Sequence, residues 1–124
     1  IYLISCVLSF FCKTFILLDF QPRFHIKVPP KIQPFSFGEE CLEQDETTSI
    51  SCLIISGDLP ISFLWLFNGA PIDSMSDVTI RQNSRKVSVL TIDAVTAEHA
   101  GNFTCVANNS AAVSSHMTTL TVNG

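Results

Sequence analysis

Five cysteines and three histidines are the residues of this chain whose side chains could bind a metal or act in catalysis. They are Cys6, Cys12, Cys41, Cys52, Cys105, His25, His99 and His116. No Cys-x-x-Cys pair and no Cys/His cluster has the spacing of a zinc site, and no nucleophile elbow, paired-carboxylate pattern or phosphate loop is present. We therefore predict no catalytic residue, metal site, cofactor or small-molecule substrate. An odd number of cysteines leaves at least one unpaired.

Cys52, Trp65 and Cys105 have the spacing of an immunoglobulin domain. Trp65 follows Cys52 by 13 residues, and Cys105 follows Cys52 by 53 residues. This resemblance implies a disulfide between Cys52 and Cys105 that bridges two sheets, with the indole packed on the sulfurs. Such a disulfide implies an oxidising compartment, and closing a loop of this length stabilises a fold by about 4 kcal/mol in the chain-entropy model. The pattern favours a secreted or cell-surface binding module over an enzyme.

The charge of the chain argues against nucleic acid as a partner. The 124 residues carry a net charge of −4, and the pI is about 5.1. Arg81, Arg85 and Lys86 form only a small local cluster and no basic stripe. An acidic stretch at residues 39–46 lacks the spacing of a calcium-binding loop, so we expect a solvated loop there.

The composition divides the chain into three parts. Residues 1–21 begin with a strongly apolar run, for which translated intron, a signal peptide and a membrane span are the open interpretations. Lys13 within this run disfavours the last two, and Phe20-Gln21 fits a translated splice acceptor. Residues 22–28 are predicted to be a linker, and residues 29–123 an immunoglobulin-like domain. Pro29 and Pro30 suit the start of its first strand.

Runs of strand-forming residues recur at short intervals from Thr48 onward, with turn residues between them. The predicted strands are Thr48–Ile55, Ile61–Phe67, Asp77–Arg81, Lys86–Ile92, Gly101–Asn108 and Ala112–Val122, with one possible helical turn at Thr96–Ala100. No longer helical periodicity is present. The sequence therefore predicts an all-β fold, an antiparallel β-sandwich.

Alternation along these strands separates core residues from surface residues. If Cys52 and Cys105 point inward, the predicted core includes Trp65, Leu90, Ile92 and Phe103. The same alternation turns four apolar residues outward on two strands that share a sheet: Leu53, Ile55, Val87 and Val89. A contiguous apolar group of this kind predicts a contact surface. Cover by neighbouring loops and a slipped strand register are the alternatives.

Two Asn-x-Ser/Thr sequons predict N-glycosylation. They begin at Asn102 and Asn108, both on the outer side or at the end of the strand that carries Cys105. A glycan at Asn102 would obstruct the outer face of that sheet. Protein contacts would then favour the opposite face of the sandwich.

The residues also resemble a narrower family. Leu90-x-Ile92-x-x-Val95 followed by Gly101-x-Phe103-x-Cys105 is similar to an I-set immunoglobulin domain. Gly57-Asp-Leu-Pro-Ile61, Trp65-Leu-Phe-Asn-Gly69 and Ala97-Glu-His-Ala-Gly-Asn-Phe-Thr-Cys105 resemble the alternatively spliced seventh immunoglobulin domain of the arthropod Dscam family. This resemblance covers about residues 28–123.

The resemblance implies a neuronal and immune surface receptor that binds identical isoforms homophilically. It also implies membrane attachment through parts of the protein outside this chain. Three residues depart from the family pattern. Phe103 replaces the usual corner tyrosine, His99 replaces an acidic residue that usually pairs with a strand arginine (here Arg81), and Cys41 is unexpected. For Cys41 we expect a buried or flexible free thiol, with an intermolecular disulfide as the alternative.

Homophilic recognition is therefore the leading functional hypothesis, with a role in axon guidance and dendrite self-avoidance. A heterophilic or pathogen-recognition domain and a structural spacer domain are the alternatives. Concentration-dependent self-association would separate these hypotheses.

Overall fold

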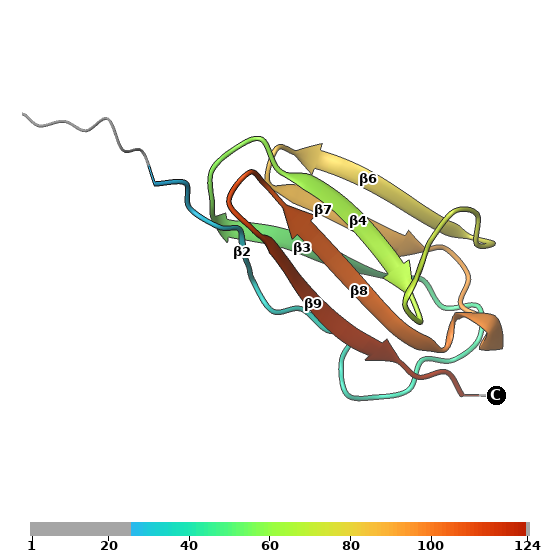
Figure 1. The fold of residues 1–124 in the computed structure, drawn as a ribbon. Coiled ribbons are helices and arrows are strands. Elements are labelled where there is room, and N and C mark those ends of the chain that lie inside the picture. Colours follow the sequence, from blue (N-terminus) through green and yellow to red (C-terminus); the bar gives the residue numbers. More distant parts are fainter. Residues whose placement is uncertain (1–25, 124) are drawn as a thin grey trace, which may run out of the picture.

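Alternating buried and exposed side chains build two four-stranded sheets in the computed structural model, which describes residues 26–123 (Figure 1). The first sheet has the order β2 (Lys31–Ile32), β3 (Thr48–Ser56), β7 (Val87–Ile92) and β6 (Val78–Ser84). The second has the order β5 (Ala70–Pro71), β4 (Ser62–Phe67), β8 (Gly101–Asn108) and β9 (Val113–Leu120). All pairings within the sheets are antiparallel. The predicted all-β sandwich is confirmed.

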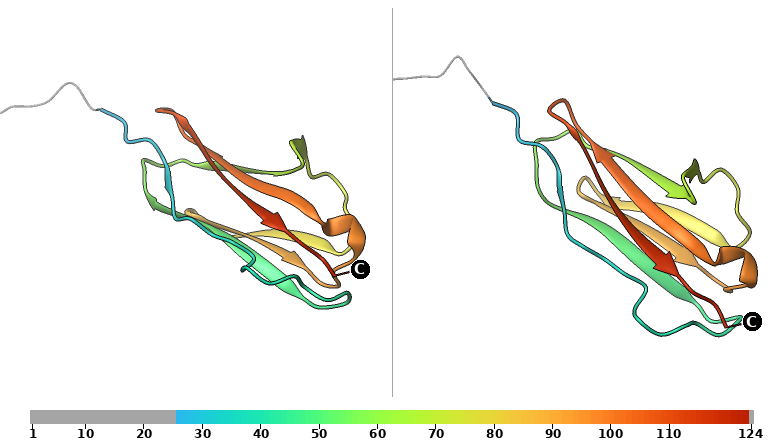
Figure 2. Two further views of the ribbon diagram at one scale, coloured as in Figure 1. Left: turned by 90° about the horizontal axis from the view of Figure 1, so that it is seen from below. Right: turned by 60° about the horizontal axis from the view of Figure 1, so that its bottom comes forward.

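The two sheets stack as separate layers when viewed edge-on (Figure 2). The predicted strand ranges match the observed strands to within a few residues, and the predicted helical turn is the 3-10 turn η1 (Ala97–His99). The largest difference is in β6, which continues past Arg81 to Ser84. A bulge between Gln82 and Ser84 accommodates the extra residue against β7.

A disulfide between Cys52 and Cys105 joins the layers at their centre. It connects β3 in one sheet to β8 in the other, with the two Cα atoms 6.3 Å apart. The implied inter-sheet disulfide is confirmed. The surrounding cluster holds the four residues predicted for the core, all at most 3% exposed: Trp65, Leu90, Ile92 and Phe103.

A buried hydrogen bond provides a second link between the sheets. The Trp65 indole N–H on β4 donates to Ser88 Oγ on β7 at 3.0 Å. Ser88 is 2% exposed, so neither group has access to water as an alternative partner. The bond satisfies a polar group that the core would otherwise leave unpaired, and it fixes the orientation of the indole over the disulfide region.

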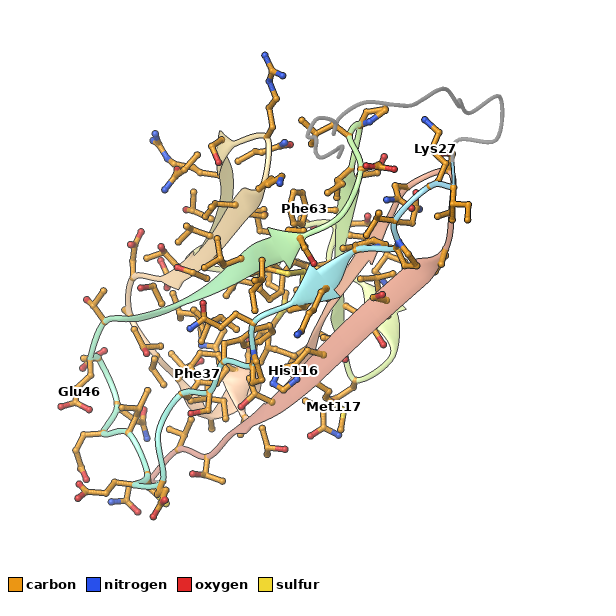
Figure 3. The ribbon with its side chains drawn as sticks, turned by 90° about the vertical axis from the view of Figure 1, so that its left-hand side faces the viewer. Lys27, Phe37, Glu46, Phe63, His116 and Met117 are labelled. Atoms are coloured by element: carbon orange, nitrogen blue, oxygen red, sulfur yellow. A yellow bond between two sulfur atoms is a disulfide. The ribbon has the colours of Figure 1, made fainter. Side chains whose placement is uncertain are left out.

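Phe103 stands at the position of the usual corner tyrosine and has no hydroxyl, so aromatic packing holds its ring in place. Its fully buried ring lies 5.4 Å from the ring of Phe37 and 4.9 Å from that of Phe67, both in tilted or edge-on arrangements. Such geometries are favourable for aromatic pairs. Phe37 belongs to the long segment that precedes β3 (Figure 3), so this packing holds that segment against β8.

Residues 30–42 cross from the first sheet to the second along the open side of the sandwich. The Ser114 hydroxyl donates to the Pro30 carbonyl at 2.6 Å, and His116 Nε2 lies 2.9 Å from the Phe35 carbonyl. Leu42 then forms a parallel bridge with Val122. These contacts cover part of β9, the edge strand of the second sheet, with chain from the same molecule.

Replacing Ser88 with alanine tests the inter-sheet hydrogen bond. We expect Ser88→Ala to lower the free energy of unfolding by about 1–3 kcal/mol, because the buried indole N–H loses its partner. Denaturant unfolding followed by Trp65 fluorescence measures the change. The control is Ser51→Ala on the neighbouring strand, where the side chain is exposed and the expected change is within about 0.5 kcal/mol. Equal effects of the two substitutions would contradict this role of Ser88.

Candidate recognition surfaces

The four apolar residues predicted to face outward lie on adjacent strands of the first sheet. We call Leu53, Ile55, Val87 and Val89 the β3/β7 patch. Leu53 pairs directly with Val87, and Ser51 pairs with Val89, so the patch is continuous across the two strands. Ile55 is 51% exposed, and the other three residues are partly buried.

The segment before β3 shields one border of the β3/β7 patch. A hollow of about 290 Å³ runs between residues 33–36 and the start of β3, and Leu53 forms part of its wall. The Gln33 backbone N–H donates to the Leu53 carbonyl at 2.9 Å, which holds this segment in place. Loop cover therefore accounts for the partial burial of Leu53, while Ile55 stays open to solvent.

Opposite charges lie at the two ends of the β3/β7 pair. Thr48 and Ile92 pair at one end of the two strands. The acidic residues next to this end are Glu43, Asp45 and Glu46, which precede Thr48, and Asp93, which follows Ile92. Basic residues lie at the other end, where Lys31 pairs with Ser56 and Lys86 precedes Val87. Lys27 and Glu46 mark these opposite ends in Figure 3. The first sheet therefore presents an apolar patch between a basic end and an acidic end.

Within residues 26–123, the outer face of β4, β8 and β9 carries no charged side chain. The register places rows of paired residues on this face, which we call the β4/β8/β9 face: Ser62, Leu64, Leu66, Asn102, Thr104, Val106, Asn108, Val113, Ser115, Met117 and Thr119. Leu64, Val113 and Met117 are 47%, 66% and 55% exposed. The two sides of the sandwich therefore differ in electrostatic character.

Both predicted glycan acceptors lie on the β4/β8/β9 face. Asn102 is partly buried, and its Oδ1 accepts a hydrogen bond from the Thr119 hydroxyl at 2.7 Å. Its backbone N–H donates to Asn68 Oδ1 at 2.9 Å. Asn108 is the last residue of β8 and is exposed.

Asn109 has a structural role that sequence reasoning missed. Its Nδ2 donates to the carbonyls of Val28 and Asp58 at 2.8 and 2.9 Å, and its Oδ1 accepts from the backbone N–H groups of Ala111 and Ala112 at 2.8 and 3.1 Å. This one side chain therefore joins the β8–β9 turn to the N-terminal segment and to the loop after β3. The sequon Asn108-Asn109-Ser110 marks Asn108 as a glycan acceptor and carries no signal of this role of Asn109.

His99 caps the 3-10 turn in place of the usual acidic residue. Its Nδ1 accepts a hydrogen bond from the Thr96 backbone N–H at 2.9 Å, so Nε2 carries the proton and donates to the Ser76 carbonyl at 2.7 Å. The ring is 2% exposed. Arg81 instead lies on the exposed strand β6, beside Val89 of the β3/β7 patch.

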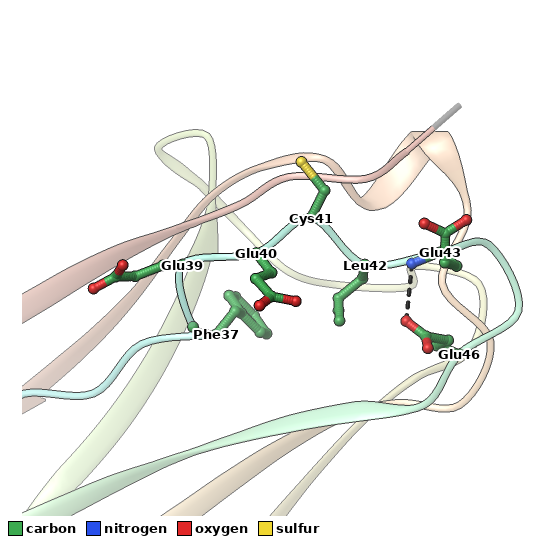
Figure 4. A pocket seen from close by; sticks show the side chains of 8 residues that line it. Phe37, Glu39, Glu40, Cys41, Leu42, Glu43 and Glu46 are labelled. Carbon is green, nitrogen blue, oxygen red and sulfur yellow. Dashed lines mark hydrogen bonds between the residues drawn. The ribbon is translucent and has the colours of Figure 1, made fainter.

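The acidic stretch forms an open hollow of about 610 Å³ beside Cys41 (Figure 4). Glu46 Oε1 accepts the Glu43 backbone N–H at 2.8 Å, and Glu43 Oε2 accepts from Asn123 Nδ2 at 2.6 Å. These two carboxylates therefore stabilise a turn and the end of the domain. Cys41 is free and exposed, which rules out only the buried form of the predicted buried or flexible free thiol.

Two further absences hold for residues 26–123. No group of three or more His, Cys, Asp or Glu side chains in this range is arranged to hold a metal ion. The same residues contain no helix long and apolar enough to cross a membrane. The interpretations of residues 1–21 lie outside the described residues.

A family model described as "Immunoglobulin domain" matches residues 29–109. The chain belongs to the immunoglobulin domain family. A crystal structure of the Dscam1 Ig7 domain, isoform 5, superimposes on this immunoglobulin domain with a TM-score of 0.75 at 41% sequence identity, covering 77% of this chain and 98% of that one. The family resemblance inferred from the sequence is confirmed.

Curated relatives show the same similarity over most of this immunoglobulin domain. Cell adhesion molecule Dscam1 of Drosophila melanogaster is 36% identical over 99 residues, which is 79% of this chain. Cell adhesion molecule DSCAM of Homo sapiens is 42% identical over 97 residues, which is 78% of this chain. The chain spans about 5% of the length of these relatives.

Replacing Asn109 with alanine tests its role at the β8–β9 turn. We expect Asn109→Ala to destabilise the domain by about 2 kcal/mol, because it leaves several backbone groups without their partner. Thermal and denaturant unfolding of unglycosylated protein from a bacterial periplasm measure the loss. Asn108→Ala is the matched control at the exposed neighbouring residue, with an expected change within about 0.5 kcal/mol. An equal loss in both variants would refute the role of Asn109.

Proposed function

We propose that the chain is an extracellular recognition module of a cell adhesion receptor, and that it binds a second copy of itself through the β3/β7 patch. The similarity to cell adhesion molecules supports the placement at a cell surface, with membrane attachment through other parts of the full protein. Binding between identical isoforms would serve neuronal wiring, in axon guidance and dendrite self-avoidance. The observation that carries the proposal is the apolar patch between ends of opposite charge.

The charge distribution favours a two-fold symmetric pair. If two copies face each other with β7 strands running in opposite directions, the basic end of each copy lies against the acidic end of the other. Lys86 and Asp93 bracket β7 and would meet their counterparts across the axis. Such an interface is self-complementary, which homophilic binding requires.

The binding of one domain would be weak. Four side chains make a small apolar contact, and exposed ion pairs add only about 0.2–1 kcal/mol each. Specific recognition at a cell surface would then come from several domains acting together. A weak single-domain contact suits a receptor that discriminates between similar isoforms, because a few substitutions in one interface are then enough to change the total affinity.

Lysine substitutions on the two faces test which face mediates self-association. We expect Ile55→Lys to raise the dimer dissociation constant about tenfold or more, because it places a charged side chain inside the apolar contact, where the ammonium loses its hydration. The matched control is Leu64→Lys on the β4/β8/β9 face, at a residue of similar exposure, 47% against 51%. Analytical ultracentrifugation of the 124-residue chain over a concentration series measures both.

The outcomes separate the alternative functions. Reversible dimerisation that is lost in Ile55→Lys and kept in Leu64→Lys supports the proposal. A chain that stays monomeric at the highest concentrations would favour a structural spacer or a heterophilic or pathogen-recognition domain. Dimerisation that only Leu64→Lys abolishes would move the interface to the opposite face.

A charge exchange tests the antiparallel arrangement itself. We expect Lys86→Glu alone and Asp93→Lys alone each to weaken self-association about tenfold, because each pairs like charges twice across the axis. An equimolar mixture of the two variants should regain affinity, since every facing pair is then opposite in sign. Sedimentation equilibrium of the separate and mixed variants is the measurement. No recovery in the mixture would rule out this orientation.

A further inference from the structure

The β4/β8/β9 face has eleven outward side chains, and none of them is acidic or basic. Several are exposed aliphatic groups. Leu64 pairs with Val106 in one row, and Thr104 pairs with Met117 in the next. A patch of this kind on a domain surface normally has a partner that covers it. The absence of charge disfavours an electrostatically guided protein partner and suits a neutral one.

The two sequons lie at opposite ends of this face. Asn102 and Asn108 belong to the same strand, β8, and an even spacing of six residues keeps both side chains on the same side of the sheet. At about 3.4 Å per residue, the two asparagines are about 20 Å apart. The apolar rows of Leu64 and Met117 lie between them.

We propose that Asn108 carries an N-linked glycan and that this glycan covers the apolar part of the β4/β8/β9 face. This inference rests on the extracellular placement in the proposed function, but not on homophilic binding. The covering group is the neutral core saccharide, whose C–H surfaces contact aliphatic side chains and whose hydroxyls face water. A neutral, amphipathic cover fits a face that offers aliphatic, hydroxyl and amide groups and no charge.

The modification is a group transfer from a lipid-linked oligosaccharide pyrophosphate. A bond forms between Asn108 Nδ2 and C1 of the first sugar, and the bond between C1 and the pyrophosphate oxygen breaks. Nδ2 gives up one proton, and the lipid pyrophosphate leaves. The Ser110 hydroxyl completes the acceptor sequence Asn108-Asn109-Ser110.

Asn108 is the better placed of the two acceptors in the folded domain. It is the last residue of β8, and its side chain is exposed. Asn102 is partly buried between Asn68, which accepts its backbone N–H, and Thr119, which donates to its side-chain oxygen. A glycan on Asn108 therefore needs no rearrangement of the strand, and its first sugars lie next to Val113 and the Leu64 row.

Mass spectrometry of the secreted chain tests the acceptor. The 124-residue chain is produced in insect cells behind a heterologous secretion signal, and glycopeptides are mapped after enzymatic release in heavy-oxygen water. We expect occupancy at Asn108, lost in both Asn108→Gln and Ser110→Ala. Additional occupancy at Asn102 agrees with the proposal, and Thr104→Ala then isolates the Asn108 glycan. No occupancy at Asn108, or occupancy at Asn102 alone, overturns it.

Hydroxyl-radical footprinting tests the cover. We expect labelling of Leu64 and Met117 to fall about twofold in the glycosylated chain relative to Ser110→Ala, as when half of an exposed side chain is covered. Ile55 on the opposite face is the internal control and should label equally in both. Equal labelling of Leu64 in the two proteins would show that the glycan leaves the face open. Both readouts are taken at a concentration at which the two proteins are monomeric, so failure of the homophilic proposal would not affect them.

Discussion

The structure depends on one constraint, the covalent and hydrogen-bonded linkage of the two sheets at Cys52, Cys105, Trp65 and Ser88. The disulfide joins β3 to β8, and the indole joins β4 to β7, so each link pairs a central strand of one sheet with a central strand of the other. Once these side chains point inward, the twofold alternation of a strand decides the direction of every neighbour. The composition of both outer faces follows from that choice.

This dependence explains how far the sequence could predict the fold. The strand ranges followed from local alternation, and the disulfide and the sheet shared by β3 and β7 followed from the resemblance to an immunoglobulin domain that three residues carry. Alternation places Ser88 on the inward side of its strand with Leu90 and Ile92, but its hydrogen bond to the Trp65 indole was not predicted, because the two residues are 23 positions apart and leave no local signal. The four hydrogen bonds of Asn109 were equally hidden, since two of their partners lie 51 and 81 residues away and leave no local signal.

The departures from the family pattern are compensated in two different ways. His99 replaces a carboxylate but supplies an acceptor to the Thr96 backbone and a donor to the Ser76 carbonyl. Phe103 loses a hydroxyl and packs instead against two other phenylalanine rings, one of them in the segment before β3. Both residues still hold the chain in place near η1 and β8. His99 does so with hydrogen bonds from its imidazole in place of a carboxylate, and Phe103 does so with ring packing in place of a hydroxyl.

The two faces of the sandwich are suited to different neighbours for the same physical reason. Close, self-complementary protein contact needs a surface free of bulky groups with charges arranged to meet their opposites, and the β3/β7 patch has both features. A hydrated saccharide needs an anchor and tolerates a neutral surface, which the β4/β8/β9 face offers at Asn108. Because the sheets are locked back to back, a glycan on one face lies on the far side of the domain from the β3/β7 patch. One core can therefore support a shielded face and a recognition face without either interfering with the other.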